Sequence, residues 1–160
     1  MRREFHDQLL KLWGREPFAI LKRWDDSAAE AGAPVIRRNL GNQTFLPLLG
    51  KDIGVGADID ITLLTGQPSQ KRVLSSGDLD NRVKRLVDAL RAPQQEGELV
   101  SDLAPNSTWH CLLEDDDVVT SITAKLGVYL ASNDPAESFA FIRVRPTGLR
   151  VSLSNIAMLL

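Results

Sequence analysis

The 160-residue sequence contains only one cysteine, Cys111, so no pair of thiols is present to form an internal disulfide. Such sparse use of cysteine is typical of proteins that fold in a reducing compartment. Long apolar runs are also missing, since none approaches the roughly 18 residues that a membrane-spanning helix needs. The first residues, "MRREFHDQLLKLW", mix acids with bases and have no apolar core, unlike a signal peptide. We therefore expect a soluble, cytoplasmic protein that does not enter a membrane.

An excess of basic residues is missing as well. Lysine and arginine total 19 against 21 aspartates and glutamates, a formal net charge of −2. Nucleic-acid-binding domains are usually basic, so the overall charge does not by itself indicate one. The distribution is uneven, however, because residues 71–91 hold six bases and three acids whereas residues 92–137 hold nine acids and only Lys125 as a base. A basic stretch beside an acidic one suits a protein that holds a polyanion and a divalent cation, and it equally suits a solvated acidic loop.

The length predicts a single domain spanning residues 1–160, because a domain typically has roughly 150 residues. Apolar residues at helical spacing predict helices within residues 1–32, which would form an N-terminal helical extension. Alternation of apolar and polar residues predicts a strand over residues 55–65, with the isoleucines and Leu63 on one face. Residues 94–110 are polar and have no period, so we expect a long inserted loop there.

A central helix is predicted to begin at Asp78 and to end shortly before Pro93. Its apolar stripe consists of Leu79, Val83, Leu86, Val87 and Leu90. Alternating patterns then predict strands over residues 118–130, 138–146 and 149–154. This order of elements predicts an α+β fold in which a small mixed or antiparallel sheet packs against a long central helix.

Two clusters of carboxylates stand at the ends of predicted elements. Asp78 and Asp80 open the central helix, where an aspartate serves as an N-cap or gains about 0.3–1 kcal/mol from the helix dipole. The run of four acids over residues 114–117 has an ordinary explanation as a solvated turn. A divalent cation such as Mg²⁺ would explain both clusters together, because it binds carboxylate oxygens and offsets their repulsion. Two such ions roughly 4 Å apart can activate a water and stabilise the leaving oxygen of a phosphodiester.

Lys84 lies four residues after Asp80 and four before Asp88, on the same side of the predicted helix. One interpretation is a ladder of surface ion pairs, each contributing only a few tenths of a kcal/mol. In the other, Lys84 faces the scissile phosphate or holds a metal-binding carboxylate in place. Both interpretations fit the spacing.

The stretch "DLDNRVKRLVDAL", followed later by "LEDDDVV", resembles the signature of the RusA family of Holliday junction resolvases. The preceding strand, "DIDITLL", also suits the layout of that family. The resemblance covers residues 57–130, and its first block is the specific part. The matching residues are Asp78, Asp80, Asn81, Lys84, Asp88, Ala89 and Leu90 in the first block and Asp115, Asp116 and Val119 in the second.

The resemblance implies a small homodimeric endonuclease that depends on Mg²⁺, or on Mn²⁺ in its place, and cuts four-way DNA junctions by paired nicks. A two-fold dimer would present two identical sites to a roughly two-fold junction. By position, Asp78, Asp80 and Asp116 would be the catalytic carboxylates that bind the metal. Lys84 would be the essential base near the phosphate, and Asp115 would be an auxiliary metal-binding acid. The neighbouring bases Arg82, Arg85 and Arg91 could bind flanking phosphates of branched DNA.

Two other functions remain open. A catalytically silent module that binds nucleic acid or a protein partner would explain the long acidic loop, the missing excess of bases and the extra helices. A nuclease with the same site could instead act on flapped, otherwise branched or RNA substrates.

The remaining candidate residues have simpler interpretations. His6 and His110 lack the spacing of metal ligands, so we expect structural roles for both. Cys111 stands beside two leucines and is expected to be a buried small hydrophobe. Trp109 falls in the predicted loop, where it could stack on an unpaired base or anchor the loop.

Overall fold

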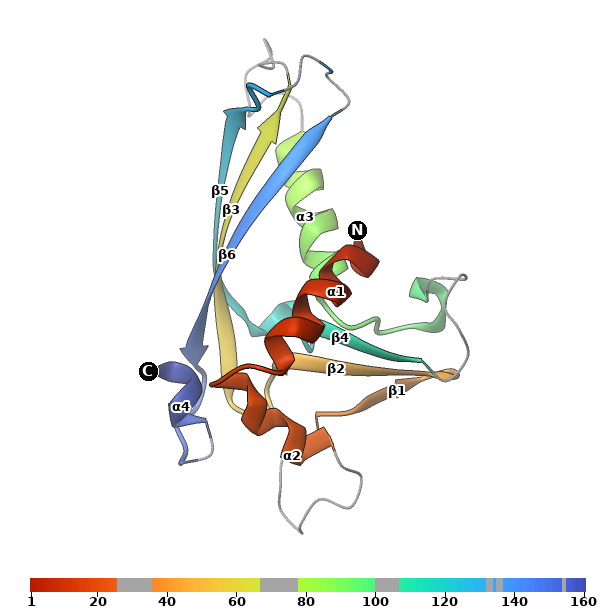
Figure 1. Ribbon diagram of the computed structural model, residues 1–160, viewed down its shortest axis with the longest axis vertical. Coiled ribbons are helices and arrows are strands. Elements are labelled where there is room, and N and C mark those ends of the chain that lie inside the picture. The colour runs from red at the N-terminus through yellow and green to blue at the C-terminus, as the bar shows by residue number, and fades with distance from the viewer. Residues whose placement is uncertain (26–35, 67–77, 100–106, 132–133, 135–136, 154) are drawn as a thin grey trace.

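The computed structural model describes residues 1–25, 36–66, 78–99, 107–131, 134, 137–153 and 155–160, without the side chains of Arg23 and Asp78. Helices and strands are mixed along the chain, so the predicted α+β class is confirmed. Figure 1 shows a long upright sheet, a short sheet across its lower end, and two larger helices on one side of the long sheet.

The strands form two three-stranded sheets, where a single sheet was predicted. The short sheet has the order β1-β2-β4, and the long sheet has the order β5-β3-β6. Each sheet contains one parallel and one antiparallel pair. The chain passes from one sheet to the other through a turn at Gly54, whose φ of 69° favours glycine. The strands are β1 (Arg38–Leu40), β2 (Gln43–Leu49), β3 (Val55–Thr65), β4 (Thr108–Leu113), β5 (Val119–Val128) and β6 (Ser138–Gly148).

Helices occur within residues 1–25, as predicted for the N-terminal segment, and the first of them ends beside Gly14. Residues 26–32 of the predicted helical extension lie outside the described part. The helix that begins at Asp78 has 13 residues against 12 in the first helix, so it does not stand out as a long central one. None of the helices in the described part of the chain is long and apolar enough to cross a membrane. The helices are α1 (Arg2–Trp13), α2 (Lys22–Asp25), α3 (Asp78–Leu90) and α4 (Ile156–Leu159), with 3₁₀ turns at Phe18–Leu21, Glu96–Glu98 and Asp116–Val118.

One predicted loop ends earlier than expected, and one predicted strand is not formed by its described residues. The predicted loop over residues 94–110 ends in strand β4, which begins at Thr108, while residues 100–106 of it lie outside the described part. The predicted strand over residues 149–154 is not formed by its described residues, 149–153. There the Asn155 side chain accepts a hydrogen bond from the backbone N–H of Ser152 at 2.9 Å and holds a turn that leads into α4.

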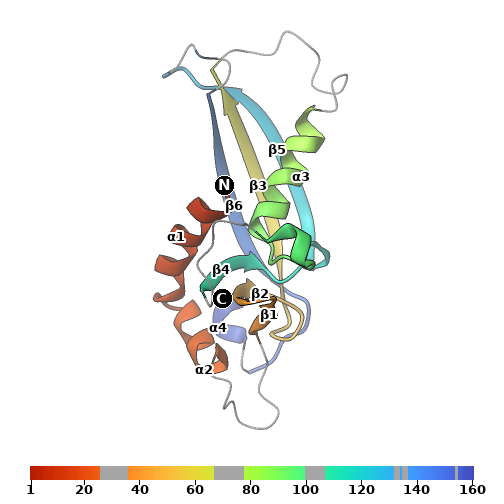
Figure 2. The ribbon, with the colours of Figure 1, turned by 90° about the vertical axis from the view of Figure 1, so that its right-hand side faces the viewer.

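The core lies between the long sheet and the helices. The predicted alternation in β3 is confirmed, because Ile59, Ile61 and Leu63 are all at most 5% exposed. Leu86 and Leu90 from α3 pack into the same core, and each buried leucine contributes roughly 1.5–3 kcal/mol. Figures 1 and 2 show α1 and α3 on the same side of the long sheet, so its opposite face carries neither helix.

The direction of α3 decides where the acidic run lies. Strands β3 and β5 are parallel, and α3 belongs to the connection between them. Directly after α3, Arg91 forms a β-bridge with Leu113, and the backbone N–H of Ala92 donates to Leu113 O at 2.9 Å. The acidic run that follows Leu113 therefore starts at the C-terminal end of α3 and leads into β5.

Candidate functional site

A groove of about 570 Å³ lies between α3 and the beginning of β5. Residues four apart on a helix share one side, which places Asp80, Lys84 and Asp88 along the groove. Valines on both walls give it an apolar component. The lining residues are Asp80, Val83, Lys84, Val87 and Asp88 from α3, and Asp116, Asp117, Val119, Thr120, Ser121 and Ile122 from the acidic run and β5.

Three of the predicted catalytic residues line this groove, namely Asp80, Lys84 and Asp116. Asp78 is the first residue of α3, and its side chain lies outside the described part. The carboxylate of Asp115 does not line the groove. It accepts a hydrogen bond from the backbone N–H of Asp116 at 2.8 Å and so caps the 3₁₀ turn Asp116–Val118.

The acids next to these residues have partners inside the protein. Glu114 forms an ion pair with Arg38, and its carboxylate also accepts from the backbone N–H of Lys51 at 2.7 Å. Asp117 forms an ion pair with the Lys51 ammonium, and this hydrogen bond raises the pKa of Lys51 above its ordinary value. Two bases therefore partly neutralise the acidic run: Arg38 on β1 of the short sheet and Lys51 in the turn after β2.

Asp88 is also paired, since its carboxylate accepts from the Arg91 guanidinium at 3.2 Å. By contrast, the side chains of Asp80, Lys84 and Asp116 make no hydrogen bond or ion pair with any residue in the described part of the chain. All three are exposed. The groove thus holds two carboxylates and one ammonium that are available to an external ligand.

These three groups are spread along the groove. With a rise of 1.5 Å per residue, the Cα atom of Asp80 lies about 16 Å along the helix axis before that of Arg91, which marks the entry of the acidic run. Asp80 and Asp116 therefore lie toward opposite ends, and Lys84 lies between them. Among the residues that the structure describes, no three or more His, Cys, Asp or Glu side chains are grouped to hold a metal ion.

The three arginines predicted to bind phosphates have different surroundings. Arg85 is exposed on α3, and Arg82 is half-buried beside it. Arg91 is only 14% exposed, because its guanidinium is held between Asp88 and Glu98, the latter at 3.1 Å. Arg91 thus fastens the end of α3 to the 3₁₀ turn Glu96–Glu98.

Comparison of the chain with protein-family models, with curated proteins and with solved structures finds no match in any of the three. The functional interpretation therefore depends on the groove itself. Local sequence patterns missed Arg38 and Lys51, which neutralise the acidic run from more than sixty residues away. In the sequence both residues are recognisable only as bases, and the residues beside them do not indicate which acid each one pairs with.

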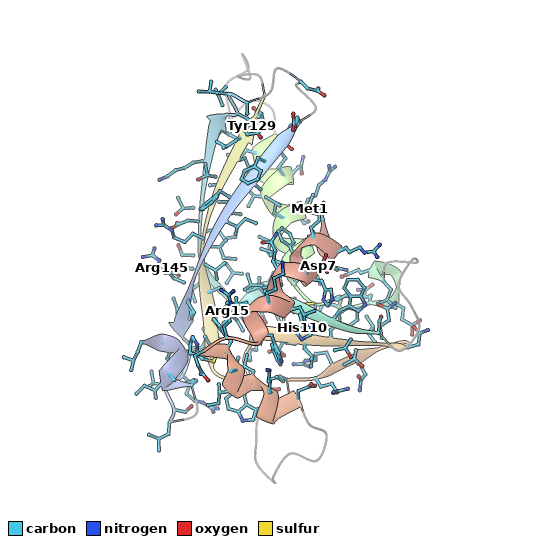
Figure 3. All side chains as sticks on the ribbon, in the orientation of Figure 1. Met1, Asp7, Arg15, His110, Tyr129 and Arg145 are labelled. Atoms are coloured by element: carbon cyan, nitrogen blue, oxygen red, sulfur yellow. The ribbon has the colours of Figure 1, made fainter. Side chains whose placement is uncertain are left out.

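The histidines have the structural role that was expected. His6 Nδ1 accepts from the backbone N–H of His110 at 3.0 Å, and the His6 ring lies 4.4 Å from the Trp109 ring. Burial lowers the pKa of His110 to about 4, so its ring is neutral at physiological pH. Figure 3 shows His110 under α1, where it joins this helix to the short sheet.

Trp109 and Cys111 are also structural. Trp109 is only 8% exposed and donates from its indole N–H to the Ser107 hydroxyl at 2.7 Å, so it anchors the chain and is not free to stack on a base. Cys111 is buried, as predicted. Burial raises the pKa of its thiol to about 12, which excludes a reactive thiolate at neutral pH.

Proposed function

We propose that the chain is a Mg²⁺-dependent, structure-specific endonuclease that cuts four-way DNA junctions as a homodimer. The observation that carries this proposal is the set of unpaired groups in the groove. Asp80, Lys84 and Asp116 have no partner among the residues that the structure describes, whereas the neighbouring Asp88 and Asp117 have one. The resemblance of residues 78–90 and 112–119 to the RusA signature supports the choice of a four-way junction as the substrate.

The donor chemistry of the groove fits Mg²⁺, with Mn²⁺ as an alternative ion. Mg²⁺ usually binds one or two carboxylates together with waters and the phosphates of its substrate. Because Asp80 and Asp116 lie toward opposite ends of the groove, each would hold its own ion through one carboxylate, waters and phosphate oxygens. The predicted ligands Asp78 and Asp115 stand two residues and one residue from them in the chain. A bound ion of this kind lowers the pKa of a coordinated water and offsets charge on the phosphate.

Cations of the chain would favour the binding of a polyanion in the groove, either by contacting phosphates or by pairing with the acids beside it. Lys84, between the two carboxylates, would bind a phosphate oxygen and stabilise the charge that develops on it. The pairing of Asp117 with Lys51 and of Glu114 with Arg38 reduces the negative charge that DNA would meet at this end of the groove. Arg85, exposed on α3, would contact a flanking phosphate.

A second candidate function is a silent module that binds branched DNA or a protein partner. The spread of Asp80 and Asp116 along the groove favours it, because no compact group of metal ligands is present among the described residues. Isothermal titration calorimetry with Mg²⁺ and Mn²⁺ separates the two functions. A nuclease takes up the ion and loses binding at the Asp116 end of the groove in Asp116→Asn, whereas a silent module need not take up the ion.

The direct test of the nuclease is Asp80→Asn on a labelled four-way junction. We expect this variant to bind the junction in Ca²⁺ and to lose nicking in Mg²⁺, because the change removes one charge and leaves the size of the side chain. Asp7→Asn is the matched control, since Asp7 is exposed on α1, away from the groove (Figure 3). Normal nicking by Asp80→Asn would rule out this mechanism.

A further inference from the structure

The face of the long sheet opposite α1 and α3 exposes two large aromatic side chains. Phe139 and Phe141 on β6 are 50% and 61% exposed. Side chains alternate along a strand, so Ala140, Ile142 and Val144 point to the core while the phenylalanines point outward. Exposed aromatic residues this close together are unusual on a surface that contacts only water.

A third aromatic ring extends this surface. Tyr129, which directly follows β5, stacks on Phe139 with ring centroids 6.2 Å apart and planes inclined by 14°. Figure 3 shows Tyr129 at the upper end of the long sheet. Two cations lie near the rings on this face. Thr62 of β3 pairs with Lys125 on one side and Phe141 on the other, and Arg143, opposite Asp60, follows two residues after Phe141.

The two acids on this face, Asp58 and Asp60, lie on β3 opposite Arg145 and Arg143 of β6. Asp58 accepts from the Thr120 hydroxyl at 2.6 Å, and Asp60 lies 3.8 Å from the Arg145 guanidinium, so both acids on β3 are engaged. Lys125 and Arg143 form no ion pair or hydrogen bond through their side chains with the described residues. The half nearer Tyr129 therefore combines the aromatic rings with the charge of Lys125, and Arg143, opposite Asp60, lies at the boundary of this half.

We propose that this half of the open sheet face binds single-stranded nucleic acid. Bases stack on exposed aromatic rings, and lysine or arginine beside them holds the phosphates, which is how several sheet-based domains bind single strands. Phe139 and Phe141 are two residues apart, about 6.6 Å along the strand, so each can take its own base. This binding goes beyond junction cleavage and does not depend on the carboxylates of the groove.

A second copy of the chain fits this face less well. If two copies packed face to face, Lys125 and Arg143 of both would enter the interface, and Asp60 of each copy already lies 3.8 Å from its own Arg145. Burying unpaired charges opposes such an interface. A polyanion supplies the missing negative charge.

The test is fluorescence anisotropy of a labelled oligothymidine of about 12 nucleotides, titrated with protein in EDTA so that no strand is cut. We expect Phe141→Ala to weaken binding roughly tenfold, since one stacked base is lost. Leu153→Ala is the matched control, because Leu153 is 95% exposed on a different part of the surface. Circular dichroism of both variants checks that they are folded.

Salt dependence tests the two cations. For single strands, each neutralised phosphate contributes about −0.7 to the slope of log K against log salt, so Lys125→Ala with Arg143→Ala should reduce the slope by about 1.4. Arg150→Ala, which removes an exposed charge elsewhere, should leave the slope unchanged. The proposal is overturned if Phe141→Ala binds as tightly as the unmodified protein, or if light scattering shows that Phe141→Ala instead dissociates a dimer.

The two proposals fail independently. If Asp80→Asn cuts junctions normally while Phe141→Ala loses single-strand binding, the nuclease is wrong and the open-face site stands. If Asp80→Asn abolishes cutting and Phe141→Ala binds single strands normally, the nuclease stands and the open-face site is wrong.

Discussion

Replacing Lys84 with alanine should remove activity without removing stability. The Lys84 side chain is exposed and forms no ion pair or hydrogen bond with the described residues, so no stabilising contact is lost. Alanine has a higher helix propensity than lysine, and exposed substitutions usually change the free energy of unfolding by less than about 0.5 kcal/mol. The loss of one positioned donor to a transition-state phosphate costs about 2.7–4 kcal/mol, which corresponds to a rate about 10²–10³-fold lower.

The assay measures single-turnover nicking of a four-way junction in Mg²⁺ beside a urea titration of the same preparation. Lys11→Ala is the control, because it removes an exposed lysine from the last turn of α1, away from the groove. We expect Lys84→Ala to lose most of its rate at an unchanged urea midpoint and Lys11→Ala to keep both. A role for Lys84 at the phosphate is excluded if Lys84→Ala keeps its nicking rate, or if its urea midpoint falls together with the rate.

Two further predictions concern the stability of the fold. Asn155→Ala should lower the free energy of unfolding by roughly 3 kcal/mol in a urea titration, because the buried amide donates to Ile53 O and Arg150 O and these acceptors would lose their partner. A loss below about 1 kcal/mol would contradict this role. His110 has a pKa lowered by burial from 6.5 to about 4, so the unfolded chain takes up its proton first as pH falls. Stability should therefore be complete above pH 6.5 and decline toward pH 4, by on the order of 2 kcal/mol, and His110→Phe should largely flatten this decline.

The elements with strong periodicity were predictable from the sequence. Helix α3 and strand β3 each bury one face, so apolar residues recur at the helical or the strand period and polar residues fall on the other face. For the same reason the spacing of Asp80 and Lys84 indicated one side of a helix, and the groove contains both.

The pairing of distant segments was not predictable in the same way. Strand β4 pairs in parallel with β2 from about sixty residues away, and its polar flanks made it look like part of a loop. Register and partners are decided by contacts between segments, which a local pattern does not record. Such contacts also determine that the strands form two sheets. They determine as well that the acidic run begins at the C-terminal end of α3.

We propose that the groove between α3 and β5 cuts branched DNA with a divalent ion. The most direct measurement incubates the unmodified protein with a labelled four-way junction, with and without Mg²⁺, beside duplex and single-strand controls. We expect paired nicks in the junction in Mg²⁺, none in EDTA, and little cutting of the controls. Binding of the junction without nicking in either Mg²⁺ or Mn²⁺ would contradict it and leave the silent module.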